Sequence, residues 1–303
     1  SFMRIQINKY ILVILFLCAN IITISFMVYF TYHIGQMTLF PIPVNIKFSN
    51  FAHLNKQVED IHVNSKAFII YDPKSRSAIA GKNEYFRFTP ASTVKIMTAL
   101  IAIEEYPLDK ILLAAGVDEI TGSKMKLEEG ETITVESLLY GLMLPSGNDA
   151  AHVLSENYPG GKEAFVKRMN VRARDLRLEN THFVDPAGFE NENYTTAFNL
   201  ARLAAYAMEN KVFRKIVSTG EKSVYDASGQ IVHELKNLNA LLGINGVNGV
   251  KTGFTEEAGG VLVTSVEQEG KEYTIVVLNS SDRFEDTQAI IINAIKNITL
   301  MSY

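Results

Sequence analysis

A serine and a lysine three residues apart are the first pair of side chains in this 303-residue sequence that could do chemistry together. Ser92 and Lys95 follow Pro90 at the start of a run with helical spacing of apolar residues, so both side chains project from one helix face. A serine hydroxyl is a good nucleophile only when a base removes its proton, and a lysine is such a base only when its pKa is lowered. The start of the helix would also stabilise an oxyanion beside Ser92.

This pair alone is a weak signal, because S-x-x-K occurs by chance about once in 400 positions at roughly 5% for each residue type. The alternative is an ordinary helix-start serine with a surface lysine. Two further motifs change the interpretation.

The second motif is Ser146-Gly147-Asn148, in a predicted turn between two helices. Its hydroxyl could relay a proton, and its amide could orient Lys95 and bind a substrate backbone. Taken alone, it would be a plain turn, since Ser, Gly and Asn are common turn residues.

The third motif is Lys251-Thr252-Gly253, inside a predicted strand. A lysine and a threonine can hold a carboxylate there, and the glycine lets a substrate backbone come close. The alternative is a strand edge protected by a lysine. Taken together, in this order and on these three kinds of element, the motifs indicate a catalytic site.

The elements that must position these residues follow from residue patterns. A strand, turn and strand are expected over residues 66–71 and 77–80, and a helix runs from Pro90 to before Pro107. Thr134 is expected to cap a further helix. The other expected helices are residues 135–144, 149–156, 161–176, 196–209 and 286–298, and the late strands are residues 247–254, 259–267 and 272–278. The fold class is therefore α+β, with one antiparallel sheet flanked by terminal helices and a mostly helical lobe.

Composition limits the function classes. The chain is 47% hydrophobic and 20% charged, which is enough apolar material for a core. A net charge of −4 makes a nucleic acid an unfavourable partner. The single cysteine, Cys18, excludes an internal disulfide and a cysteine-based zinc site, and no H-E-x-x-H motif is present.

The three motifs and their surroundings resemble the D-alanyl-D-alanine carboxypeptidases, which are low-molecular-weight penicillin-binding proteins with a fold like that of β-lactamases. The resemblance covers residues 66–283. The stretches that carry it are residues 90–99, 144–151, 180–188 and 249–259.

The resemblance implies a role for each motif residue. Ser92 would attack the carbonyl between the two terminal D-alanines of a peptidoglycan stem peptide, Lys95 would be the general base, and Ser146 would pass the proton to the leaving amine. β-Lactams would acylate the same serine, and no metal or other cofactor would be needed. The residues implied to bind substrate are Asn148, Lys251, Thr252, Gly253 and Phe254, the last through its backbone N–H, which would form an oxyanion hole with that of Ser92.

Two departures from the family pattern affect these expectations. Many relatives continue into a C-terminal β-rich domain, which we expect to be absent here. Relatives have His or Phe after K-T-G, and Phe254 leaves only its backbone N–H available at that position.

Two alternatives stay open at the level of the sequence. A β-lactamase would need a carboxylate to activate water, and Glu179 is the nearest candidate, although its surroundings lack the E-x-x-L-N form of that class. A catalytically silent β-lactam sensor or wall-binding module would keep the pocket but not turnover.

The N-terminal segment has the pattern of a membrane span. Residues 10–30 carry no charge and, as a helix, would be about 31 Å long. Arg4 and Lys9 lie before this run, which places the N-terminus in the cytoplasm and the rest outside. We therefore expect a cytoplasmic tail (1–9), a single-pass transmembrane anchor (10–30), a stalk (31–50) and an extracytoplasmic D,D-peptidase domain (51–303). If residues 10–30 are instead a cleaved signal peptide, the protein is secreted.

Overall fold

A computed structural model describes residues 20, 23–25, 51–54, 61–295 and 298–301. The chain divides into two units, Ser1–Phe48 and Ser49–Tyr303, and the three motifs all belong to the second. The predicted tail, membrane span and stalk lie outside the described residues, apart from residues 20 and 23–25, which are helical. Within the described part of the chain, no helix combines the length and the apolar character that a membrane span requires.

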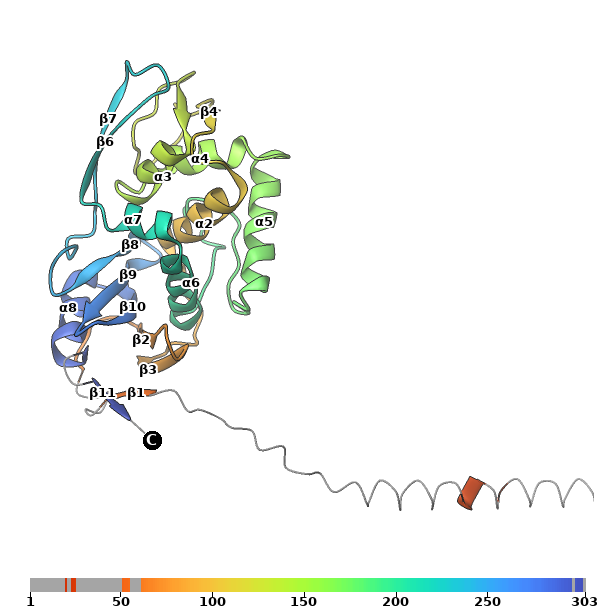
Figure 1. The fold of residues 1–303 in the computed structure, drawn as a ribbon, viewed down its shortest axis with the longest axis vertical. Coiled ribbons are helices and arrows are strands. Elements are labelled where there is room, and N and C mark those ends of the chain that lie inside the picture. The colour runs from red at the N-terminus through yellow and green to blue at the C-terminus, as the bar shows by residue number, and fades with distance from the viewer. Residues whose placement is uncertain (1–19, 21–22, 26–50, 55–60, 296–297, 302–303) are drawn as a thin grey trace, which may run out of the picture. The chain divides into compact units, whose positions relative to one another are not determined.

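A five-stranded antiparallel sheet forms the base of the second unit, as Figure 1 shows. Its strand order is β3-β2-β10-β9-β8, so the two early strands join the three late ones as predicted. The K-T-G strand β8 is at one edge. The strands are β2 (Ala67–Asp72), β3 (Ser77–Lys82), β8 (Val247–Thr255), β9 (Gly259–Gln268) and β10 (Lys271–Ser280).

Side chains of this sheet alternate between two hydrophobic cores, because successive residues of a strand point to opposite faces. In β2, Ile69 belongs to the larger core and Ile70 to the smaller one. Helix α8 (Arg283–Asn293) covers the smaller core, and α6 (Ala197–Glu209) covers the other face. Terminal helices were predicted to flank the sheet. In the described residues α8 is such a helix, whereas the helix on the other face, α6, comes from the middle of the chain.

The helical lobe is built around α2 (Lys95–Glu105), which follows the 3₁₀ turn η2 (Ala91–Val94). Helix α2 packs against α6 and every other helix of the lobe, and residues 95–102 are all buried. The surrounding helices are α3 (Val135–Met143), α4 (Asn148–Glu156), α5 (Gly161–Asp175) and α7 (Lys211–Val217). Burial on all sides, rather than along one stripe, removes the start of α2 from water.

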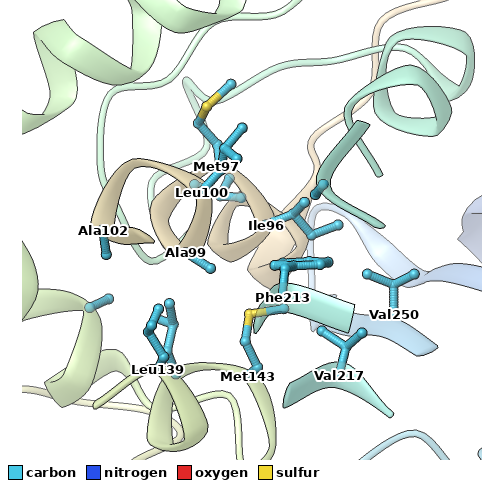
Figure 2. Packing of buried hydrophobic residues seen from close by; sticks show 14 of the residues in the cluster. Ile96, Met97, Ala99, Leu100, Ala102, Leu139, Met143, Phe213, Val217 and Val250 are labelled. Carbon is cyan, nitrogen blue, oxygen red and sulfur yellow. The ribbon is translucent and has the colours of Figure 1, made fainter. Parts of the chain in front are cut away.

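Figure 2 shows how this packing connects the lobe to the sheet. Phe213 and Val217 of α7 lie between α2 and β8, which contributes Val250. Burial of each large apolar side chain stabilises the fold by roughly 1.5–3 kcal/mol. The S-x-x-K helix and the K-T-G strand are therefore held by one continuous core.

Several elements differ from the sequence predictions. The last helix ends at Asn293 instead of residue 298, because Ile298–Met301 form strand β11, which pairs with β1 (Phe51–Leu54). That helix also starts earlier, at Arg283, because the Asp282 side chain caps it by accepting hydrogen bonds from two backbone N–H groups. Helix α7 and two hairpins were not predicted. The hairpins are β4 (Ile111–Leu113) with β5 (Thr132–Thr134), and β6 (Glu221–Tyr225) with β7 (Val232–Lys236).

The predicted cap of α3 is confirmed, since Thr134 Oγ1 accepts a hydrogen bond from the backbone N–H of Ser137 at 3.2 Å. This cap satisfies one of the four free N–H groups at the helix start. The cap fixes where α3 begins, and the C-terminal end of α3 leads into the Ser146 turn.

Candidate active site

The S-x-x-K pair lies where η2 passes into α2. Lys95 is the first residue of α2 and is fully buried, and its Nζ lies 3.1 Å from Ser92 Oγ. Ala91, the first residue of η2, has a φ of +47°, a conformation that costs a non-glycine residue energy. This geometry presents the serine hydroxyl directly to the amine.

Lys95 Nζ has two further partners, which come from distant parts of the chain. It donates to Asn148 Oδ1 at 2.8 Å and to the carbonyl oxygen of Ala187 at 2.6 Å. The structure therefore brings the first motif into direct contact with the asparagine of the second. Together these contacts aim the amine at Ser92.

Burial lowers the pKa of Lys95 to about 7, although the nearby carboxylates of Asp185 and Asp149 act in the opposite direction. A substantial fraction of the amine is therefore neutral near pH 7. A neutral amine within hydrogen-bonding distance of a hydroxyl can accept its proton. The site thus supplies the base that the sequence argument required.

The loop that carries Ala187 is organised by Asp185, a residue to which the sequence analysis gave no role. Its buried carboxylate accepts hydrogen bonds from the backbone N–H groups of residues 187, 188 and 190 at 2.7–2.9 Å. Gly188 fits here because a Cβ would lie 1.9 Å from the carbonyl oxygen of Ala91. The local signal was an Asp followed by Pro and Gly, which is typical of a turn in which the Asp side chain binds the backbone.

The second motif forms the turn between α3 and α4, as predicted. Ser146 has a φ of +64°, and its buried hydroxyl has no hydrogen-bond partner within the described part of the chain. Asn148 Nδ2 donates to the carbonyl oxygen of Thr121 at 2.8 Å while its Oδ1 accepts from Lys95. An amide carries two N–H groups, so Asn148 keeps one for a substrate.

The third motif lies on the edge strand β8, beside the S-x-x-K turn. A Cβ placed on Gly253 would lie 2.9 Å from the backbone nitrogen of Ser92, so only glycine fits there without displacement. The Phe254 side chain is exposed, which leaves its main chain as the part able to serve the site. The oxyanion hole from the N–H groups of Ser92 and Phe254 stays a prediction, to which this close approach lends support.

Lys251 is buried, and its Nζ donates to the carbonyl oxygen of Thr252 at 2.8 Å. Burial holds its pKa well below the ordinary value, and the neighbouring cations Lys95 and Arg283 lower it further. For Lys95, too, burial is the largest cause of the lowered pKa.

Arg283 is a site residue that the sequence analysis missed. Its Nε donates a hydrogen bond to Thr252 Oγ1, and burial lowers the pKa of its guanidinium. Three basic side chains therefore gather around the motif residues, and they favour an anionic ligand group. The sequence carried little signal for this role, because Arg283 is the first residue of a helix and no motif links it to Thr252.

Together, the antiparallel sheet, the helical lobe and this serine–lysine arrangement define an enzyme of the β-lactamase and penicillin-binding-protein class. Glu179, the candidate water-activating residue of a β-lactamase, is exposed after α5, and no hydrogen bond joins it to the motif residues in the described structure. The chain belongs to the D-alanyl-D-alanine carboxypeptidase family, whose family model matches residues 54–282.

Curated relatives agree with this assignment. The chain is 32% identical over 234 residues to the D-alanyl-D-alanine carboxypeptidase DacF of Bacillus subtilis, a match that covers 75% of this chain and 60% of DacF. It is 31% identical over 225 residues to a D-alanyl-D-alanine endopeptidase of Pseudomonas aeruginosa, with 73% of each chain covered.

A solved structure gives the same result for the fold. The crystal structure of the Streptomyces K15 DD-transpeptidase matches with a TM-score of 0.71 and 32% sequence identity, covering 77% of this chain and 97% of that one. The predicted family and the predicted α+β fold are therefore confirmed. The comparisons favour the carboxypeptidase interpretation over the β-lactamase and sensor alternatives.

Proposed function

We propose that this chain is a serine-type D,D-carboxypeptidase, which removes the terminal D-alanine of peptidoglycan stem peptides through an acyl-enzyme on Ser92. The observation that carries the proposal is the buried amine of Lys95, 3.1 Å from the Ser92 hydroxyl. The neutral amine has two N–H groups, which the oxygens of Asn148 and Ala187 can accept, so its lone pair is left for the proton of the Ser92 hydroxyl.

In the acylation step, Ser92 Oγ attacks the carbonyl carbon of the penultimate D-alanine while Lys95 Nζ takes the hydroxyl proton. The C–N bond to the terminal D-alanine breaks, and the leaving nitrogen takes that proton through the Ser146 hydroxyl. The products are an ester on Ser92 and free D-alanine. The buried, unpartnered hydroxyl of Ser146 supports this relay, because such a group costs free energy unless a bound substrate gives it a partner.

In the deacylation step, a water molecule attacks the ester carbonyl and gives its proton to Lys95. The C–O bond to Ser92 breaks, the serine recovers a proton, and the shortened peptide leaves as a carboxylic acid. The backbone N–H groups of Ser92 and Phe254 stabilise the oxyanion of both steps.

The terminal carboxylate of the substrate binds at Lys251, Thr252 and Gly253, with the guanidinium of Arg283 beside Thr252. Asn148 holds the substrate amide on the other side of Lys95. A β-lactam presents the same carboxylate and a reactive amide, so it acylates Ser92 and blocks the site.

The N-terminal segment anchors the enzyme in the cell membrane, with the catalytic domain outside the cytoplasm. The support for this part of the proposal is the charge-free run over residues 10–30 and the two cations before it. An extracytoplasmic position also brings the enzyme to its wall substrate.

The deciding experiment is release of D-alanine from a peptide that ends in D-Ala-D-Ala, measured for the wild type and for Ser92→Ala. We expect release by the wild type alone. A wild type that is acylated by penicillin but releases no D-alanine would instead indicate a silent sensor, and rapid penicillin hydrolysis would indicate a β-lactamase.

A further inference from the structure

A cavity of about 180 Å³ adjoins the catalytic residues, and its lining includes neither Lys251 nor Arg283. It shares Asn148 and Ala187 with the site, which are two of the hydrogen-bond partners of Lys95. We call this cavity the lateral pocket. Its remaining lining comes from residues 119–121, from α4, from the first turn of α5 and from residues 185–190.

The position of the lateral pocket determines which part of a substrate reaches it. In the proposed function the terminal carboxylate lies at Thr252, the scissile carbonyl lies at Ser92 and Asn148 holds the substrate amide, so the rest of the peptide continues past Asn148, which also lines the lateral pocket. Consecutive Cα atoms are 3.8 Å apart, so the next residue along the chain is the first whose side chain can enter. That residue is the third of the stem peptide.

The lining of the lateral pocket includes apolar side chains. Phe189 is 58% exposed, and Ile120 also contributes to the lining. An exposed aromatic ring beside a catalytic site is suited to the methylene stem of a long side chain. The third residue would therefore carry several methylenes.

The lateral pocket also carries charges of both signs. Lys162 is partly buried, whereas Glu119 and Glu190 are exposed. In the described structure none of these three side chains has an ion pair or a hydrogen bond. They can all take a charged group from a ligand.

Two other polar residues of the lining are already occupied. Asp185 accepts hydrogen bonds from several backbone N–H groups and from Asn193, and its oxygens face its own loop. His152 Nε2 lies 2.9 Å from the carbonyl oxygen of Ala115, which fixes the ring. The charged side chains left for recognition in the lateral pocket are therefore Lys162, Glu119 and Glu190.

We propose that the lateral pocket receives the third residue of the stem peptide and selects a side chain that ends in both an ammonium and a carboxylate group. Lys162 binds the carboxylate, Glu119 and Glu190 bind the ammonium, and Phe189 contacts the methylenes. This inference rests on the proposed function, since it assumes that a peptide ending in D-Ala-D-Ala is bound at Ser92.

The test uses three peptides of the form Nα-acetyl-X-D-Ala-D-Ala and measures kcat/KM for D-alanine release. In these peptides X is meso-diaminopimelic acid, whose side chain ends in both an ammonium and a carboxylate, L-lysine, which ends in the ammonium alone, or L-norleucine, which carries no charge. We expect kcat/KM to fall about tenfold or more at each removal of a charge, as for a charge-assisted hydrogen bond in a partly enclosed site.

Variants assign each preference to its residue. Lys162→Met should bring kcat/KM for the diaminopimelate peptide close to that for the lysine peptide, so that their ratio is near one. Lys167 is an exposed lysine of α5 outside the pocket, and Lys167→Met should keep the wild-type ratio. The pair Glu119→Gln and Glu190→Gln should likewise remove the preference for lysine over norleucine. Glu179→Gln is the matched control for these, because Glu179 is exposed and outside the pocket.

Equal kcat/KM for the three peptides, or a lysine peptide cleaved as fast as the diaminopimelate peptide, would overturn the proposal. So would a ratio that survives Lys162→Met. Failure of the proposed function has a different signature, because then no peptide releases D-alanine whatever its third residue.

Discussion

Arg283 Nε donates a hydrogen bond to Thr252 Oγ1 and so joins the first residue of α8 to the K-T-G strand, 31 residues earlier in the chain. The contact places a guanidinium beside a residue that binds the terminal carboxylate of the substrate in our proposal. Arginine suits this position because its planar fork binds a carboxylate through two parallel hydrogen bonds.

Replacement of Arg283 by Gln is therefore expected to lower kcat/KM for a D-Ala-D-Ala peptide by about 10- to 100-fold, the range of a hydrogen bond to a charged group. The wild type should cleave the same peptide with a C-terminal carboxamide slowly, and the variant should have little further loss of kcat/KM on this amide. Arg174→Gln, an exposed cation on α5, is the control for charge alone. Equal losses on the acid and the amide would show that Arg283 does not bind the carboxylate.

The pH dependence of acylation tests the state of Lys95. Because its pKa is about 7, the neutral base is present above pH 7 and disappears as the amine gains a proton below it. The rate of penicillin acylation should rise with pH through a midpoint near 7. A rate that stays flat from pH 5 to pH 9 would contradict this assignment.

A substitution at the same residue gives an independent test. Lys95→Arg keeps a permanent positive charge and cannot act as a base. It should lose about 10²-fold or more in acylation rate, the usual contribution of general base catalysis. Near-normal acylation of this variant would move the base elsewhere.

Gly253→Ala tests the close approach of β8 to the nucleophile. The new Cβ would lie 2.9 Å from the Ser92 nitrogen, so either the strand or the S-x-x-K turn must move. A misplacement of this kind is expected to slow acylation by about 10²-fold. Gly220→Ala is the matched control, because a Cβ there meets nothing within 4 Å; similar acylation rates for the two variants would refute the argument.

The proposed membrane anchor makes a prediction about fractionation. A segment of about 20 mostly apolar residues is held in a bilayer too strongly for salt or alkali to remove it. The full-length protein should stay with membranes after an alkaline wash and keep its N-terminal residues. Recovery from the native host of a mature chain that begins between residues 31 and 46 would show a cleaved signal peptide instead.

Much of the fold could be predicted from the sequence because its central elements have strong apolar patterns. Strand β2 is buried throughout, and α2 has Ile96 and Leu100 at helical spacing, so both were placed within a few residues. Strand β7 was missed because only His233 and Leu235 are buried in it, and Glu234 and Lys236 are charged and exposed. Strand β11 depends on pairing with β1, a contact that no local pattern reveals.

The site residues that belong to a short sequence motif could be predicted from the sequence. Ser92, Lys95 and Asn148 were found from their spacing, and hydrogen bonds now join them. Asp185 and Arg283 were missed because each acts on residues far away in the chain, through a backbone loop or through the neighbouring strand. Their roles arise from tertiary contacts, which spacing does not encode.

The central claim is that Ser92 forms the acyl-enzyme, and mass spectrometry of the penicillin-treated protein tests it most directly. After digestion, the added mass of the penicilloyl group is expected on Ser92 in the wild type, and Ser92→Ala should carry no adduct while its thermal unfolding temperature stays near that of the wild type. An adduct on another residue of the wild type, or labelling that persists in folded Ser92→Ala, would contradict the account.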